Sequence, residues 1–306
     1  MIGIKDISYY RPEELLSNLN VVDKFDVTED FIKDKIGMIT LAQKKPEQET
    51  SDLAMAAVNS LFEQSELTPE QVECLIIVTQ NPDGGGLPHT SAILHNKLQL
   101  KKRCCVFDIS LGCSGYVQGL SIIKGLMESQ GFENGILVTA DPYSKIINSS
   151  DRDTSMIFGD GATATWLGKS PSWKIGASDF GIDSSKNGSL KIDESGQLYM
   201  NGRSVFNFAA VEVPKSVERV LDQTSLKIDD IDLVVLHQGS KYIVDAIAKR
   251  IGSEGKTPFV AKDYGNTISS SIPIILAENT PSSAKTILLS GFGVGLSWAT
   301  CIIERA

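Results

Sequence analysis

The chain of 306 residues lacks several features that would define other classes of protein. No apolar run reaches the ~18–20 residues that a membrane span requires, which excludes insertion into a bilayer. The opening segment, MIGIKDISYYRPEELL, lacks the charged and then apolar pattern of a secretory signal. Five cysteines, uneven in spacing and odd in number, are too few for a disulfide scaffold. We therefore expect a protein of the reducing cytoplasm.

Basic residues are outnumbered by acidic residues. The formal net charge is −9 and the pI is about 5.0, so a diffuse negative field argues against general nucleic-acid binding. A local basic patch for a small anionic partner remains compatible with this balance. No metal site is expected, because His237 has no partner at ligand spacing and Cys104 and Cys105 are adjacent.

An internal repeat organises the chain. Residues 62–77 and 221–236 align without a gap at a constant offset of 159, and both predict a helix end, an acidic turn and a short apolar strand. Such a match favours duplication of an ancestral unit. We predict two halves, residues 1–168 and 169–306, each within the usual range of domain sizes.

Short aliphatic runs alternate with helical patterns in both halves. Runs without polar alternation predict central strands covered on both faces. These runs are residues 74–78, 104–109, 136–139, 162–167, 233–236 and 286–289. Apolar residues at three-to-four spacing predict helices over 116–127 and 213–221. The alternation indicates a layered α/β fold.

The segment 106–116 carries the first candidate for chemistry. A strand enters a tight turn flanked by glycines and continues into a helix, which is the pattern of a nucleophile elbow around Cys113. Because the free N–H groups of a helix N-terminus favour an anion, we expect Cys113 to ionise more readily than a free thiol. A small cysteine packed in a turn is the alternative at this motif, and core packing is the prediction for the other four cysteines.

Three further segments place polar groups at the ends of predicted elements. His237 ends the strand 233–236, and ligands bind at the carboxyl ends of parallel strands. Asn266 lies in a turn of small polar residues before a helix, where a helix cap is the alternative. The glycine-rich turn around Val294 has bare backbone N–H groups that could hold an oxyanion.

In this order the four segments resemble the 3-oxoacyl-(acyl-carrier-protein) synthase III family of the thiolase superfamily. Residues 151–162 are similar to the family's arginine loop and GDGA turn, and residues 200–206 to its M-x-G-x-x-V-F segment. The resemblance extends from about Thr28 to the C-terminus. It implies an α/β, thiolase-like layered αβαβα fold built from two duplicated halves, and a homodimer.

The resemblance assigns catalysis to Cys113, His237 and Asn266. It implies that Cys113 takes an acyl group from a thioester and that decarboxylative Claisen condensation with a malonyl-type thioester gives a 3-oxoacyl product. His237 and Asn266 would donate hydrogen bonds to the thioester carbonyl, while the N–H groups of Cys113 and Val294 would form the oxyanion hole. Thioesters of coenzyme A or acyl-carrier protein are the expected substrates, without a cofactor, in fatty-acid or specialised acyl-chain biosynthesis.

Several binding positions depart from the family pattern. Phe31 stands where the family has a tryptophan that stacks on the coenzyme A adenine, and Lys35 stands at a usual arginine. With Arg152 they form the predicted coenzyme site. Leu87 replaces a phenylalanine at the gate of the acyl pocket, and Val294 replaces the middle glycine of a turn.

The family's arginine for docking the carrier protein is Tyr242 here, so docking is expected to depend on Lys241, Lys249 and Arg250. These departures favour a specialised relative. Three alternatives remain: an acyltransferase that passes the acyl group from Cys113 to an amine, hydroxyl or other acceptor, a non-catalytic partner subunit, and a cysteine hydrolase. Release of CO2 with a 3-oxo product separates condensation from the others.

Overall fold

The computed structural model describes all 306 residues, which form thirteen strands and eight helices. The strands are β1 (Ile2–Tyr10), β2 (Glu14–Ser17), β3 (Thr40–Gln43), β4 (Cys74–Val78), β5 (Cys105–Ile109), β6 (Asn134–Ala140), β7 (Ala162–Lys169), β8 (Trp173–Ile182), β9 (Leu190–Ile192), β10 (Leu198–Met200), β11 (Leu233–Leu236), β12 (Thr286–Gly293) and β13 (Ser297–Arg305). The helices are α1 (Val22–Phe25), α2 (Thr50–Gln64), α3 (Thr90–Lys97), α4 (Gly115–Gln130), α5 (Arg152–Ser155), α6 (Gly202–Thr224), α7 (Lys241–Ile251) and α8 (Ser271–Asn279). None of these helices is both long and apolar enough to cross a membrane.

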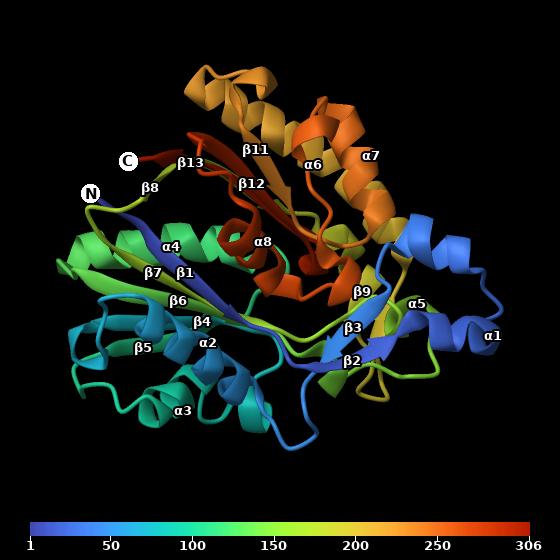
Figure 1. Ribbon diagram of the computed structural model, residues 1–306, viewed down its shortest axis with the longest axis horizontal. Coiled ribbons are helices and arrows are strands. Elements are labelled where there is room, and N and C mark those ends of the chain that lie inside the picture. The colour runs from blue at the N-terminus through green and yellow to red at the C-terminus, as the bar shows by residue number, and fades with distance from the viewer.

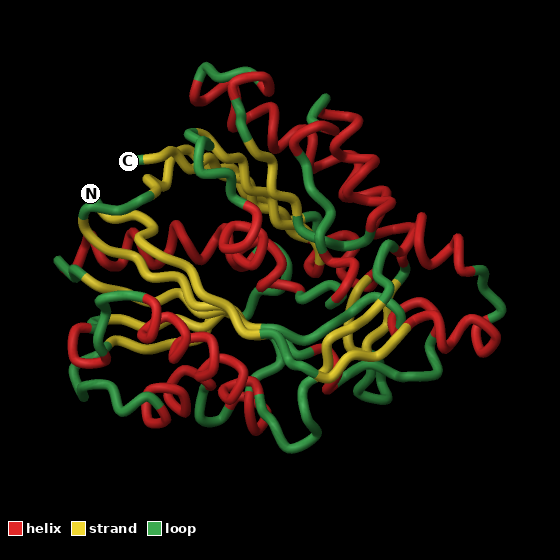
Figure 2. The backbone as a smooth tube through the Cα atoms, viewed as in Figure 1, coloured by secondary structure: helices red, strands yellow, loops and turns green.

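The large strands form one hydrogen-bonded order, β11-β12-β13-β8-β1-β7-β6-β4-β5. Only two residue pairs join β1 to β8, so the order divides there into two sheets that diverge (Figures 1 and 2). Helices α4 and α8 lie between these sheets, α2 and α3 cover one outer face, and α6 and α7 cover the other (Figure 1). The five layers confirm the predicted αβαβα fold.

The internal repeat is visible in the structure of both halves. The turn at Pro69–Gln71 leads into β4, and the turn at Ile228–Asp230 leads into β11, at the same offset of 159 residues. Outward from β1 and β8, the two sheets also place corresponding strands in the same order, β7-β6-β4 and β13-β12-β11. The duplication is therefore structural as well as sequential, while the boundary at residue 168 stays a prediction.

All six predicted strands are present, but the predicted central position was wrong for two of them, β5 and β11, which lie at the edges of the sheet. Strand β5 forms a free edge of the sheet, and each of its five residues is only half-buried. Its apolar sequence looks like that of a central strand, because a local run of apolar residues does not show whether a strand is paired on one side or on both. The second edge strand, β11, is fully buried on both faces.

The packing of helices α4 and α8 between the two sheets fixes the positions of the turns that precede these helices. One apolar cluster joins the inner faces of both sheets to α4 and α8, with Tyr116, Leu120 and Ile123 from α4 and Ile272 and Ile275 from α8. These residues recur at helical spacing, so each helix presents an apolar stripe to the sheets. Burial of both stripes aims the N-termini of the two helices at a common region of the fold.

Asp179 on β8 fastens helix α6 to its sheet. Its carboxylate accepts hydrogen bonds from Arg219 Nε and Nη2 at 2.7 and 2.8 Å, from Ser216 Oγ at 2.6 Å and from Trp298 Nε1 at 2.9 Å. Burial alone would raise the pKa of this carboxyl, but the hydrogen bonds outweigh burial and lower it to about 2. The carboxylate is therefore ionised throughout the physiological range.

Replacing Asp179 by alanine removes the acceptor of four hydrogen bonds from Arg219, Ser216 and Trp298, so we expect the free energy of unfolding to fall by about 2–3 kcal/mol at pH 7. Lys215→Ala is the matched control on α6, because the exposed pair of Lys215 with Glu212 contributes under about 0.5 kcal/mol. Since the folded pKa of Asp179 lies below its usual value, the contribution is complete above about pH 4 and is lost as pH falls towards 2. Urea unfolding of both variants measures this, and equal losses would contradict it.

Candidate active site

Four segments that are far apart in the sequence meet at a cavity of about 500 Å³. Cys113 precedes α4, His237 follows β11, Asn266 lies in the turn before α8, and Gly293 ends β12. The structure thus brings together the predicted catalytic residues. Most of the remaining wall is apolar and includes Ile157, Phe158, Leu190, Met200, Val205 and Phe206.

Backbone hydrogen bonds hold the Asn266 turn in place. Asn266 N–H donates to Ile157 O at 2.8 Å, and Gly159 N–H donates to Asn266 O at 3.0 Å. A Cβ at Gly159 would lie 1.9 Å from Tyr264 O, so only glycine permits this approach. The GDGA segment therefore acts as a backbone support for the asparagine.

Cys113 is 5% exposed, and its thiol faces two backbone N–H groups. These belong to Val294 and to Cys113 itself, which are the predicted oxyanion-hole donors. A Cβ at Gly293 would lie 2.6 Å from Sγ, so a side chain there would fill the space beside the sulfur. Cys113 and Gly293 line the same cavity as His237 and Asn266. The sulfur, the space beside it and these two side chains therefore belong to one site.

The expectation that Cys113 ionises readily was wrong. Burial raises the pKa of the Cys113 thiol to about 12, although the hydrogen bonds from Val294 and Cys113 N–H oppose the rise. The nearby Asp141 carboxyl raises it further. The sequence pattern predicted the helix N-terminus, which lowers the pKa of a thiol, but it could not show that the folded chain removes water from the sulfur. Desolvation has the larger effect on the pKa of Cys113.

His237 and Asn266 lie side by side and are each 3% exposed. His237 Nε2 is 3.4 Å from Asn266 Nδ2. Ile268 N–H donates to Asn266 Oδ1 at 2.9 Å, which turns the Nδ2 group towards the histidine. Burial lowers the pKa of His237 to about 3, so the imidazole is neutral at pH 7. The pair offers two neutral polar groups to the cavity.

The serine on the other side of the imidazole was missed at the sequence level. Ser271 Oγ lies 2.8 Å from His237 Nδ1. Ser271 belongs to a run of three serines in the turn of small polar residues that contains Asn266, and from the sequence we assigned these serines no role in the site. The spacing of five residues from Asn266 was the available signal, because it places the hydroxyl at the first residue of α8.

The predicted coenzyme residues gather beside the cavity. Phe31 and Arg152 line an adjacent hollow, with the guanidinium 5.5 Å from the ring centroid. This hollow and the cavity share Met200 and Arg203, so the two are neighbours. Lys35 lies at the mouth of the cavity, which is marked by the half-exposed lining residue Tyr242.

Tyr242 forms an aromatic wall at that mouth. Its ring stacks on Phe206 with centroids 5.1 Å apart, and the ammonium group of Lys35 lies 4.5 Å from its centroid. Both aromatic residues line the cavity. The position at which the family has a docking arginine therefore holds an apolar contact here, with a neighbouring cation supplied by Lys35.

The predicted docking cations are not equivalent. Lys241 begins α7 beside the mouth, where it forms an ion pair with Asp245. Lys249 and Arg250 lie about 12 Å farther along this helix, at a rise of ~1.5 Å per residue. Arg250 lines a different hollow against α6. The structure thus separates Lys241 from the other two cations.

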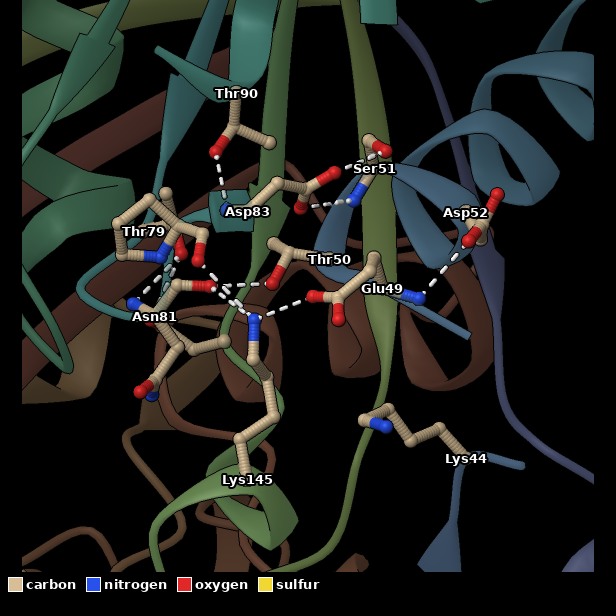
Figure 3. A network of polar contacts seen from close by, with 12 residues as sticks. Lys44, Glu49, Thr50, Ser51, Asp52, Thr79, Asn81, Asp83, Thr90 and Lys145 are labelled. Carbon is tan, nitrogen blue, oxygen red and sulfur yellow. Dashed lines mark hydrogen bonds and ion pairs between the residues drawn. The ribbon is translucent and has the colours of Figure 1, made fainter. Parts of the chain in front are cut away.

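Leu87 does not line the cavity of its own chain and is 89% exposed. Its loop is nevertheless firmly anchored (Figure 3). Asp83 accepts hydrogen bonds from Ser51 N and Oγ at 3.0 and 2.5 Å, Asp83 N–H donates to Thr90 Oγ1 at 3.1 Å, and Lys145 Nζ donates to the preceding carbonyl at 3.1 Å. A role for Leu87 at an acyl pocket stays a prediction, because the single chain does not bring it there.

No group of three or more His, Cys, Asp or Glu side chains is arranged to hold a metal ion.

Comparisons of sequence and structure with known proteins all find the same family. The profile of 3-oxoacyl-[acyl-carrier-protein (ACP)] synthase III matches residues 107–184, and that of its C-terminal domain matches residues 221–305. Beta-ketoacyl-[acyl-carrier-protein] synthase III of Streptococcus pneumoniae R6 is 32% identical over 98% of both chains. A 2.1 Å crystal structure of a 3-oxoacyl-(acyl-carrier-protein) synthase III superposes with a TM-score of 0.93 at 33% identity, covering 99% of each chain. The Aquifex aeolicus enzyme of the same name gives 0.93 at 26% identity over the whole of both chains.

The fold and the cavity together define a condensing enzyme of the thiolase-like class. Both halves of the chain match the profile, and the sequence identity extends over nearly its full length. The chain therefore belongs to the 3-oxoacyl-(acyl-carrier-protein) synthase III family, as its motifs predicted.

The raised pKa of Cys113 predicts its reactivity. Because the thiolate is the nucleophile and the pKa is about 12, the rate of alkylation by iodoacetamide should rise about tenfold for each pH unit from 7 to 9. Peptide mapping by mass spectrometry measures the rate at Cys113. N-acetylcysteine is the control, since the rate for a free thiol levels off above about pH 8.5. A plateau for Cys113 near pH 7 would contradict the effect of burial.

Proposed function

We propose that this protein is a cytoplasmic enzyme that joins an acyl thioester to a malonyl-type thioester with loss of CO2, forming a 3-oxoacyl thioester. One observation carries the proposal. A buried thiol, a neutral imidazole and a carboxamide line one cavity, and the imidazole and amide nitrogens lie 3.4 Å apart. This arrangement separates a nucleophile from a pair of hydrogen-bonding groups, as a two-stage condensation requires.

The first stage is acyl transfer to Cys113. Because the resting thiol is protonated, its proton leaves as the sulfur attacks the thioester carbonyl, and the departing thiolate of the carrier takes up a proton. The N–H groups of Cys113 and Val294 face the sulfur and could donate to the oxyanion that forms there. Their positions are set by the backbone, so they need no rearrangement during the reaction.

The second stage is decarboxylation of the malonyl group. Loss of CO2 leaves an enolate, whose negative charge develops on the thioester oxygen. Donors from His237 Nε2 and Asn266 Nδ2 to that oxygen would each stabilise the transition state by about 3 kcal/mol. A neutral imidazole also avoids protonating the carbanion before it attacks the acyl-Cys113 carbonyl, and the pKa of about 3 keeps His237 neutral.

We further propose that the substrates arrive as thioesters of coenzyme A or of acyl-carrier protein. Phe31 and Arg152 beside the cavity offer an aromatic face and a cation to a nucleotide with phosphates. Lys35 adds positive charge at the mouth, which suits an acidic carrier, and Lys241 lies in a neighbouring hollow where its ammonium group is paired with Asp245. Lys249 and Arg250 would contact only a carrier that extends along α7.

A homodimer is proposed from the free edge of β5. An edge strand presents unpaired N–H and C=O groups that pair readily with another chain. The five residues of β5 are only half-buried, and Val106, Phe107 and Ile109 among them are apolar. Pairing with β5 of a second copy would satisfy these backbone groups and cover the side chains.

Incubation with an acyl-coenzyme A and a malonyl thioester tests the function. We expect one acyl group on Cys113 by intact mass, followed by CO2 release and a 3-oxo product. Cys113→Ala should abolish the acyl-enzyme, whereas His237→Ala and Asn266→Ala should keep it and release CO2 about 10²–10³-fold more slowly. His95→Ala, on α3 and outside the cavity lining, is the matched histidine control.

The same assay separates the alternatives. Acyl transfer to an amine or hydroxyl without CO2 would indicate a different acyltransferase, and thioester loss to water would indicate a hydrolase. Full condensation by Cys113→Ala would rule out the proposed nucleophile.

Sedimentation analysis at micromolar concentration tests the proposed dimer. We expect twice the chain mass of 33.1 kDa and slow hydrogen exchange at the amides of β5. The amides of the small sheet formed by β2 and β3 serve as an internal comparison in the same experiment. A monomer with rapidly exchanging β5 amides would contradict pairing through this edge.

A further inference from the structure

Ser271 has a particular relation to the catalytic histidine. The hydroxyl lies 2.8 Å from His237 Nδ1 and 3.0 Å from the carbonyl oxygen of Ile268. Ser271 is 1% exposed, so water does not compete for its proton. The only groups at Nδ1 are therefore a hydroxyl, which can donate or accept, and a carbonyl, which can only accept.

The direction of this hydrogen bond decides the tautomer of the histidine. If Ser271 donates to Nδ1, the imidazole proton must be on Nε2, which faces the cavity. If Nδ1 carries the proton, Nε2 is an acceptor and cannot donate to a substrate oxygen. The condensation proposed above requires the first of these states.

Two observations favour donation by Ser271. The Ser271 hydroxyl lies within donating distance of both the Ile268 carbonyl, at 3.0 Å, and His237 Nδ1, at 2.8 Å; the contact to Nδ1 is the shorter one, and the carbonyl oxygen already uses one of its two lone pairs to accept the backbone N–H of Ser271. The distance of 3.4 Å between His237 Nε2 and Asn266 Nδ2 is longer than an N–H hydrogen bond of about 2.7–3.2 Å. Such a separation fits two N–H groups that are turned towards the same space, because neither can accept a hydrogen bond from the other.

We propose that Ser271 is a positioning residue that holds His237 in the Nε2–H tautomer by donating its hydroxyl proton to Nδ1. This inference rests on the proposed condensation and identifies what makes the imidazole a donor in it. Without the hydroxyl, the remaining neighbour of Nδ1 is the Ile268 carbonyl. Nδ1 then keeps the proton, and Nε2 faces the cavity as an acceptor.

The test combines a spectroscopic and a kinetic measurement on the full chain. The sequence has three histidines, so ¹⁵N NMR of histidine-labelled protein can assign the tautomer of His237 at pH 7. We expect Nε2–H in the wild type and in Ser271→Thr, which retains a hydroxyl, and Nδ1–H in Ser271→Ala. Ser269→Ala is the matched control, because Ser269 Oγ in the same turn donates to Asp141 and does not contact His237.

The kinetic measurement separates the two stages of the reaction. Ser271→Ala should acylate Cys113 within about twofold of the wild type but release CO2 from the malonyl thioester about 10²–10³-fold more slowly, the cost of losing one oxyanion donor. Ser271→Thr should recover most of this loss. An equal loss in both stages would indicate a merely structural role for Ser271 and overturn the proposal.

An Nδ1–H tautomer in the wild type would overturn the proposal without any variant, and so would an Nε2–H tautomer in Ser271→Ala. Failure of the proposed function gives a different result. If the wild type released no CO2 but Ser271→Ala still changed the tautomer, the role of Ser271 would stand and the condensation would not.

Discussion

Burial of Cys113 and His237 is the constraint on which the properties of this site depend. The same desolvation acts in opposite directions on these two titratable groups. It raises the pKa of the Cys113 thiol to about 12 and lowers the pKa of the His237 imidazole to about 3. Both groups are therefore neutral at rest, and charge develops only when a substrate is present. In such surroundings fixed donors stabilise charge more strongly than they do in water.

The duplicated architecture explains how one cavity receives groups from the whole chain. The middle layer contains one helix from each half, α4 and α8, and their N-terminal ends carry Cys113 and Ser271. His237 follows β11 in the second half, and the Asn266 turn is bridged to Phe158 from the first half. Each half supplies part of the chemistry, so neither half alone forms the site.

Much of the fold and of the candidate site could be predicted from the sequence alone, and the predictions that failed share one physical cause. Apolar runs predicted the six strands, and the ordered motifs predicted that Cys113, His237 and Asn266 belong together. The edge position of β5, the exposure of Leu87 and the ionisation of Cys113 were not predictable. Each depends on which atoms from distant segments surround a group, and local patterns carry no record of those atoms.

The sequence by itself determined the class of fold, its duplication and the family, because apolar periodicity and motif order are properties of the chain in one dimension. Tertiary structure decided the protonation and orientation of the catalytic groups. The tautomer of His237 depends on a hydroxyl 34 positions away in the chain and 2.8 Å away in space. Hydrogen-bond direction and desolvation arise only when such groups meet, so only the folded chain could reveal them.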